Sequence, residues 1–179
     1  ASGTVTYTRT GGSADGSSPH VVNLAGAELS SGSFSGALTN APTLVDDAVY
    51  SIAFNGVDAA GNVATTVTST SVTYDGTAPV FSGVSPSTSS SVNTADVNYT
   101  LSEALASGTV TFTESHFVSI GTPVSHTANL VENELDSGTF SGALTNAPTL
   151  SNSTPYKIEF AGFDHAGNAI NKVFANQIP

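Results

Sequence analysis

YKIEFAGFDHAGN, residues 156–168, combines two signals that decide the fold of this chain. Its first half alternates apolar and polar residues with a period of two, which predicts a strand with one buried face. Its second half, Asp-x-x-Gly-Asn, predicts a turn, because glycine adopts positive φ readily and Asp side chains bond to nearby backbone. The same combination recurs as YSIAFNGVDAAGN at residues 50–62. Each copy therefore predicts a strand followed by a reversal of the chain.

A longer repeat surrounds these two stretches. SGSFSGALTNAPTL at residues 31–44 returns as SGTFSGALTNAPTL at residues 137–150, with one change and a spacing of 106 residues. ASGTV at residues 1–5 returns at residues 106–110, a spacing one residue shorter, and a loop tolerates such a change. A repeat this long indicates one structural unit used twice in tandem. The period has the size of a small all-β domain, so 179 residues contain fewer than two complete copies.

Short alternating segments separated by Gly, Pro and Ser clusters predict a β-sandwich with no helix longer than a turn. In the complete second unit we expect strands near residues 80–86, 95–103, 108–115, 124–131, 139–145, 156–163 and 169–178. The first unit begins at the equivalent of the third of these strands. We therefore expect an incomplete domain at residues 1–75, lacking its first two strands, and a complete domain at residues 76–179.

Tyr50 and Tyr156 each open an alternating strand just after a Pro-containing corner. In Ig-like sandwiches a tyrosine at this corner bonds through its hydroxyl to the backbone a few residues upstream. The alternative is that both are ordinary core tyrosines. The alternation also predicts a set of inward-pointing side chains: Tyr50, Ile52, Phe54, Tyr156, Ile158 and Phe160.

The motif Tyr-x-Ile-x-Phe-x-Gly-x-Asp-x-x-Gly-Asn resembles the tandem bacterial Ig-like repeats of large surface adhesins and of S-layer-type or filament-forming extracellular proteins. The joining segment YDGTAPVFSGVSPSTSSSVNTADVNYTLSEALASGTVTFT is similar to the usual opening of these repeats, in which Asp-x-Thr-x-Pro precedes a Ser-Pro turn. The resemblance covers nearly the whole chain. It implies an all-β fold of tandem Ig-like antiparallel β-sandwiches, the first incomplete at its N-terminus. Function is less defined, because such modules serve several roles.

The composition restricts the partners. The formal charge is −11, and Arg9, Lys157 and Lys172 are the only basic residues besides histidines. This balance argues against nucleic acid, which requires a basic surface. The absence of cysteine excludes disulfides and thiolate metal sites, and no apolar run is long enough to span a bilayer. These features fit an extracellular or cell-surface protein of bacteria.

Acidic residues gather at one end of the predicted second sandwich, where the Ig-like topology brings several loops together. That end and the adjoining end of the first unit hold Asp75, Glu103, Glu132, Glu134, Asp136, Asp164, Asp46, Asp47 and, from a further loop, Asp15. Like charges this close require neutralisation, and Ca²⁺ accepts about six to eight oxygen ligands. We expect a Ca²⁺ site with Asp75, Glu103, Asp136 and Asp164 as candidate ligands. The alternatives are a solvated acidic rim and, for the Asp-x-x-Gly-Asn stretches, side-chain-capped turns.

No nucleophile-elbow or zinc-protease motif occurs, and the histidines are scattered, so we expect no enzyme. The expected function is a structural repeat module of an extracellular fibrous or filamentous surface protein. Its partners would be adjacent repeats of the same chain or neighbouring copies of itself. The missing strands would come from a preceding repeat or, by strand donation, from a neighbouring subunit. The alternative is an adhesin or carbohydrate-binding accessory module, with Phe163, Tyr74, Phe117 and Phe174 as candidate outer-face aromatics.

Overall fold

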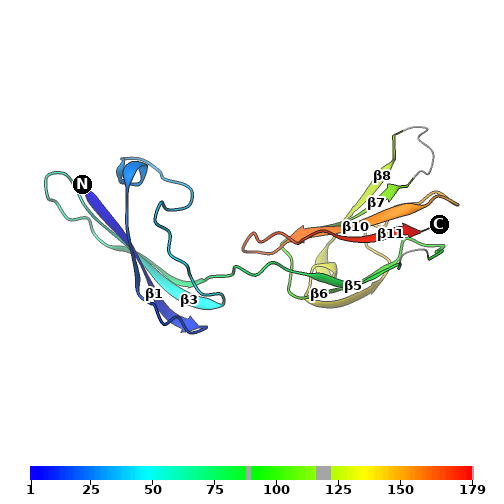
Figure 1. Cartoon of the computed structure of the whole chain (residues 1–179), viewed down its shortest axis with the longest axis horizontal. Helices are drawn as coiled ribbons and strands as arrows, with labels where there is room; N and C mark the ends of the chain where they lie inside the picture. Colours follow the sequence, from blue (N-terminus) through cyan, green and yellow to red (C-terminus); the bar gives the residue numbers. More distant parts are fainter. Residues whose placement is uncertain (88–89, 116–121, 179) are drawn as a thin grey trace. The chain divides into compact units, whose positions relative to one another are not determined.

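The computed structural model describes residues 1–87, 90–115 and 122–178 of an all-β chain (Figure 1). The chain divides into two compact units, Ala1–Gly76 and Thr77–Pro179. Two 3-10 turns, η1 at Gly26–Leu29 and η2 at Glu132–Glu134, are the helical elements in the described part. None of the described helices has the length and apolar character needed to cross a membrane.

The second unit contains two antiparallel sheets. The first sheet has the order β5-β6-β9, formed by Phe81–Ser85, Val97–Leu101 and Gly138–Gly142. The other has the order β11-β10-β7-β8, formed by Val173–Ile178, Tyr156–Phe163, Ser107–Glu114 and Ser125–Asn129. Each strand segment predicted from the alternation overlaps an observed strand. The last one begins at Val173 instead of residue 169, because Ala169 makes only an isolated bridge to Phe163.

The two sheets of the second unit share one hydrophobic core. Figure 1 shows β5 and β6 in one layer of this unit and β7, β8, β10 and β11 in the other. Phe160 of β10 lies between them, 5.4 Å from the ring of Phe81 and 5.9 Å from that of Tyr99. Tyr156, Ile158 and Phe160 are buried, as the alternation predicted. Each large apolar side chain buried in this way contributes about 1.5–3 kcal/mol, so the facing sheets stabilise each other.

The first unit contains one four-stranded sheet with the order β2-β1-β3-β4. Its strands are β1 at Ser2–Gly12, β2 at His20–Asn23, β3 at Ala48–Val57 and β4 at Val67–Thr73. Through the repeat spacing they correspond to β7, β8, β10 and β11. No second sheet occurs among the described residues of this unit. Its buried hydrophobic set is correspondingly small: Val5, Val22, Ala48 and Tyr50.

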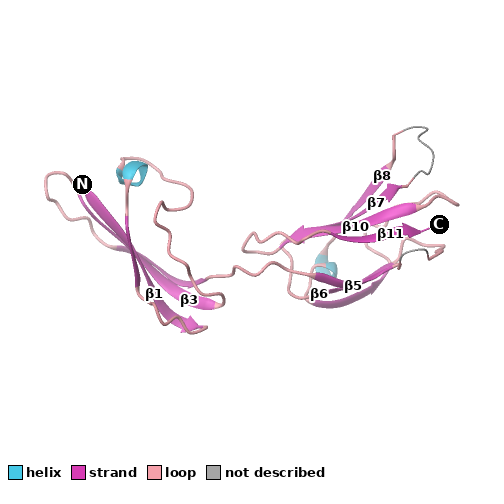
Figure 2. Ribbon diagram, viewed as in Figure 1, coloured by secondary structure: helices cyan, strands magenta, loops and turns pink. Residues whose placement is uncertain are grey.

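The repeated segment adopts two different conformations. In the second unit residues 138–142 form β9 and pair with β6, which places Phe140 opposite Tyr99. In the first unit the equivalent residues 32–36 are not in a strand, and Figure 2 shows the connection from β2 to β3 as loop apart from η1. A strand requires a partner for its backbone groups. The described part of the first unit offers no counterpart of β6, so nearly the same sequence remains a loop.

The prediction that Phe54 points inward is wrong, because 46% of its surface is exposed. Phe160, at the equivalent repeat position, is completely buried. Phe81 and Tyr99 cover Phe160 in the second unit, and no described residue of the first unit occupies the matching layer. Ile52 is only partly buried for the same reason. Alternation therefore identified the apolar face correctly, while burial depends on the opposing sheet.

Candidate functional site

The corner tyrosines make the hydrogen bonds predicted for them. The hydroxyl of Tyr156 accepts from the backbone N–H of Ser151 at 3.0 Å, and that of Tyr50 accepts from Val45 at 3.1 Å. Each donor lies five residues upstream, in the loop before the strand. Both rings are buried. The contact therefore fastens an equivalent loop in each unit, and the prediction of a backbone-bonded corner is confirmed.

Three loops meet at one end of the second unit. The N–H of Leu105, between β6 and β7, donates to the carbonyl of Leu135, between β8 and β9, at 2.9 Å. The N–H of Ala106 donates to the carbonyl of Phe163, at the end of β10, also at 2.9 Å. Backbone hydrogen bonds thus join the three connections that the sequence placed together. This end, which we call the loop end, contains the predicted ligands Glu103, Asp136 and Asp164.

Asp164 organises the turn between β10 and β11. Its Oδ1 accepts from the N–H groups of Ala166, Gly167 and Asn168 at 2.8, 2.7 and 2.9 Å. Its Oδ2 accepts from Nδ2 of Asn168 at 2.9 Å. Gly167 has the positive φ predicted for it, 95°. The side-chain-capped turn, considered above as the alternative to a metal ligand, is therefore present.

Asp164 is almost completely buried, with 2% of its surface exposed. Burial by itself raises the pKa of this carboxyl, but the hydrogen bonds from Asn168, Gly167 and Ala166 outweigh it and hold the pKa below its usual value. The side chain is consequently ionised at neutral pH. A buried carboxylate held by backbone donors provides a fixed negative charge at the loop end.

Asp58 forms the same turn in the first unit. Its Oδ1 accepts from the N–H groups of Ala60 and Asn62 at 2.8 Å, and its Oδ2 accepts from Nδ2 of Asn62 at 2.7 Å. Gly61 has φ 92°. In contrast to Asp164, Asp58 is exposed. The turn therefore forms from its own sequence in either setting, and its geometry alone does not indicate a metal.

Glu103 brings a second carboxylate to Asp164. An oxygen of Glu103 lies within 4.8 Å of an oxygen of Asp164. Calcium–oxygen distances are about 2.3–2.6 Å, so two ligand oxygens of one ion are at most about 5 Å apart. Oδ2 of Asp164 accepts one hydrogen bond, and a carboxylate oxygen can take a second partner. The donor set and its spacing therefore fit a shared Ca²⁺ ion.

The other two predicted ligands, Asp136 and Asp75, belong to other segments of the chain. Asp136 is exposed and does not lie within 4.8 Å of both Glu103 and Asp164. Asp75 is partly buried and follows β4, one residue before the first unit ends at Gly76. The N–H of Gly76 donates to Oδ1 of Asp46 at 2.6 Å. The metal role of all four predicted ligands stays a prediction.

Glu134 has a structural role that the sequence did not reveal. It is 1% exposed, and its Oε2 and Oε1 accept from the N–H groups of Val131 at 2.8 Å and Thr145 at 2.5 Å. Its carbonyl accepts from the hydroxyl of Tyr99 at 2.6 Å. Glu28, 106 residues upstream, makes the same pair of carboxylate contacts. Glu28 and Glu134 are separated by the repeat spacing. This spacing was the sequence signal that could have identified them as structural residues and not as members of an acidic rim.

Asp15 is likewise committed to contacts within its own unit. Its Oδ2 accepts from the hydroxyl of Tyr50 at 2.7 Å and lies 2.6 Å from Nε2 of His20. The hydrogen bond from Tyr50 and then that from His20 lower the pKa of Asp15 to about 2. The side chain of Asp15 is only 3% exposed. Asp15 and His20 therefore contact each other beside the corner tyrosine Tyr50, where they have a structural role.

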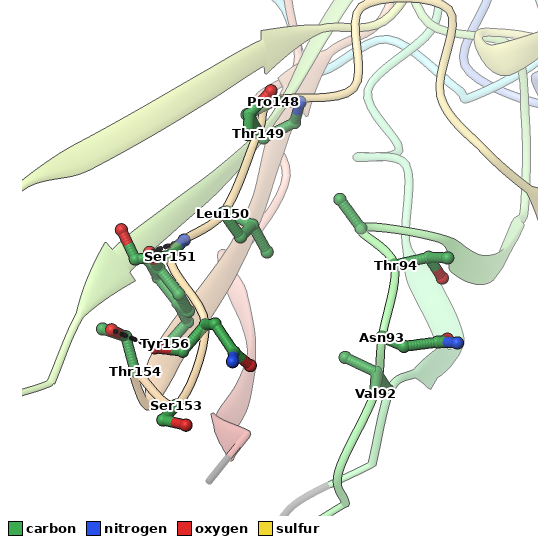
Figure 3. Close-up of a pocket in the computed structure, with 12 residues that line it drawn as sticks. Val92, Asn93, Thr94, Pro148, Thr149, Leu150, Ser151, Ser153, Thr154 and Tyr156 are labelled. Atoms are coloured by element: carbon green, nitrogen blue, oxygen red, sulfur yellow. Dashed lines mark hydrogen bonds between the residues drawn. The ribbon is translucent and has the colours of Figure 1, made fainter.

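A cleft of about 320 Å³ opens at the start of β10 (Figure 3). Figure 3 shows one wall formed by the segment before β6 and the other by the segment before β10, the lining being Val92, Asn93, Thr94, Ala95, Pro148, Thr149, Leu150, Ser151, Asn152, Ser153, Thr154 and Tyr156. None of these side chains is charged. The hydroxyl of Tyr156 already accepts from Ser151. The cleft offers amide and hydroxyl groups for hydrogen bonding, but its lining contains no carboxylate or histidine to move a proton.

Three of the aromatics considered for sugar binding are exposed. Phe163, Phe174 and Tyr74 are 47%, 41% and 39% exposed, whereas Phe117 lies outside the described residues. Phe174 pairs with Glu159 across β10 and β11, and Phe163 lies four residues further along β10. At about 3.3 Å per residue this separates their backbone positions by about 13 Å along the strand. They do not form one continuous platform.

No protein-family model and no curated protein matches this sequence.

Proposed function

We propose that this chain is a structural repeat module of an extracellular fibrous or filamentous surface protein, built from tandem Ig-like β-sandwiches. The strand order of the second unit supports the Ig-like assignment, because β5-β6-β9 faces β11-β10-β7-β8 and a corner tyrosine opens β10. One strand differs from the constant-type order: β8 pairs with β7 instead of extending the sheet of β9. Related sandwiches vary at this strand.

One observation carries the proposal: both units repeat the side-chain contacts that hold loops in place. The corner tyrosines Tyr50 and Tyr156, the glutamates Glu28 and Glu134, and the turn aspartates Asp58 and Asp164 bind equivalent backbone groups. Because the repeated side chains hold loops in place in both units, they favour a structural role, in which each module keeps its shape within an array of repeats. Repeated scaffolding of this kind is typical of a spacer or fibre.

Ca²⁺ binding is the second part of the proposal. Glu103 and Asp164 present two carboxylates at a spacing that one Ca²⁺ ion can bridge, and Asp164 is buried and ionised. A bound ion would join the β6–β7 loop to the β10–β11 turn and thereby stiffen the loop end. Asp75 and Asp136 are further predicted ligands.

Immunogold electron microscopy of the producing cells, with antibodies against this chain, tests the functional proposal. Label along extended fibres or layers at the cell surface is the expected result. Label confined to the cell interior would contradict it. Reproducible binding of the purified chain to one glycan class on an array, with no labelled fibres, would instead favour the adhesin or carbohydrate-binding alternative.

A further inference from the structure

Two pairs of equivalent phenylalanines show that the first unit presents an unfilled contact surface. Phe160 is completely buried, while its counterpart Phe54 is 46% exposed. Phe140 is partly buried and stacks on Tyr99 with a centroid distance of 5.2 Å, while its counterpart Phe34 is 47% exposed. Each pair differs in environment and not in residue type. The first unit thus carries the receiving half of an interface that is complete in the second.

The second unit shows what fills this interface. Phe81 of β5 covers Phe160, and Tyr99 of β6 contacts both Phe160 and Phe140. β6 also pairs through its backbone with β9, so one hairpin supplies both apolar cover and hydrogen bonds. The β9 sequence GTFSG recurs as GSFSG at residues 32–36. The receiving sequence in the first unit is therefore nearly identical to one that already accepts β6.

We propose that the exposed face of the first unit, together with residues 32–36, binds a two-stranded hairpin of the β5–β6 type and sequence. The proposal deepens the repeat-module function and rests on it. In the second unit Leu101 pairs with Gly138, Tyr99 with Phe140 and Val97 with Gly142. The 106-residue spacing transfers this register to Gly32, Phe34 and Gly36. The tyrosine of the incoming strand then stacks on Phe34, and its partner strand covers Phe54.

Charge and continuity favour this occupant over an unrelated partner. β3, β4 and residues 31–44 contain no charged side chain, and neither do β5 and β6. In a chain of net charge −11, these segments can come together without the repulsion that acidic surfaces would produce. The docked hairpin continues an interface that this sequence already forms within the second unit. Added strands gain affinity from main-chain hydrogen bonds and register from alternate side chains.

A synthetic peptide with the sequence of residues 77–103 tests the proposal against the full 179-residue chain. Hydrogen exchange is followed by NMR at the backbone amides of residues 32–36. Saturating peptide is expected to slow their exchange at least tenfold and to shift the ring signals of Phe34 and Phe54. The matched control peptide carries Val97→Ser and Tyr99→Ser, which remove inward side chains and keep the backbone donors. It is expected to leave these amides unchanged.

Three results would overturn the proposal. The first is unchanged exchange at residues 32–36 with saturating peptide, and the second is equal protection by the control peptide. The third is protection of residues 32–36 in the chain alone as a monomer in sedimentation, which would mean that the first unit is closed by its own strands. Peptide exchange into the second unit would appear at residues 138–142 and is distinguished by its position. Surface labelling of fibres is independent of the peptide, so each proposal can fail separately.

Discussion

Tyr156 shows how single residues stabilise the loops of this protein. Its ring is buried in the core, and its hydroxyl accepts a hydrogen bond from the backbone N–H of Ser151 at 3.0 Å. The phenol oxygen thereby supplies the acceptor that this backbone N–H requires. Tyr50 repeats this arrangement and donates in addition to Asp15. Tyrosine suits both positions because it combines a large apolar ring, which is buried, with one polar atom that can form the hydrogen bond.

Tyr156→Phe is expected to lower the free energy of unfolding of the second unit by about 1 kcal/mol, because the N–H of Ser151 loses its acceptor. Urea denaturation followed by circular dichroism measures the change. Tyr74→Phe serves as a control on an exposed ring, with an expected change of less than about 0.5 kcal/mol. Equal stability of the two variants would contradict the assigned role.

The Asp15 carboxyl predicts a pH dependence of the first unit. Its pKa in the folded chain is about 2, below the ordinary 3.8. Ionised Asp15 therefore stabilises the fold at pH values above 3.8, and this stabilisation is lost as the pH falls from 3.8 towards 2. Tyr50→Phe removes the largest cause of the lowering, so the pKa of Asp15 should rise. Carbon-13 NMR titration of the carboxyl checks this, and an unchanged midpoint in the variant would show that Tyr50 does not set it.

Strand formation in this chain depends on the neighbouring strand. β9 exists because β6 lies beside it, whereas residues 32–36, with one difference in five positions, form no strand. Short segments have little intrinsic preference for a pleated conformation, and cross-strand contacts provide most of the stabilisation. Turns behave differently, because the Asp58 and Asp164 turns form in both units from contacts within a few residues.

Ca²⁺ is expected to raise the melting temperature of the second unit by joining the loops of Glu103 and Asp164. At a hundredfold excess over the dissociation constant the stabilisation is about 2.7 kcal/mol. Scanning calorimetry with Ca²⁺ and with a chelator measures it. Glu103→Gln and Asp164→Asn should abolish the shift, and Asp75→Asn and Asp136→Asn test the other predicted ligands in the same assay.

Asp58→Asn is the matched control for Asp164→Asn. Both changes disturb the same turn hydrogen bond to an asparagine side chain, at Asn62 and Asn168 respectively. Only Asp164→Asn should remove the response to Ca²⁺. If wild-type protein melts at the same temperature in Ca²⁺ and in chelator, the acidic loop end is a solvated rim and the metal proposal fails.

The two units differ in the size of their hydrophobic cores. Among the described residues, the second unit has a cluster of fifteen buried hydrophobic residues between two sheets, whereas four are buried in the first unit. Because apolar burial is the main favourable term in folding, the units should differ in stability although they share a repeat. Their nearly identical segments therefore do not make them equivalent domains.

The whole chain is expected to unfold in two transitions, the first unit preceding the second. A matched pair of variants assigns the transitions. Phe160→Ala should cost about 3–5 kcal/mol in the later transition, since it leaves a cavity in the core. Phe54→Ala, at the equivalent but exposed position, should change the earlier transition by less than about 1 kcal/mol. Urea denaturation with hydrogen-exchange mass spectrometry resolves the units, and a single cooperative transition would contradict this assignment.

Features that depend on neighbours along the chain could be predicted from the sequence. The strands of the second unit, the positive φ of Gly61 and Gly167, and the backbone-bonded tyrosine corners all follow from patterns within a few residues. The association of the loops carrying Glu103 and Asp164 was also predictable, because the order of strands places those loops at one end. In each case the hydrophobic period, a turn motif or the order of strands is sufficient to predict the feature.

Only the tertiary structure decided the environment of each side chain. Nothing local distinguishes Phe54 from Phe160, since both sit at the same place in the same motif, and burial depends on whether an opposing sheet is present. The same holds for Glu134. Its carboxylate accepts from backbone groups three and eleven residues away, but its burial depends on the core that packs around it. Packing between segments distant in sequence determines burial. The same repeated pattern therefore forms a core where an opposing sheet is present and an exposed surface where it is absent.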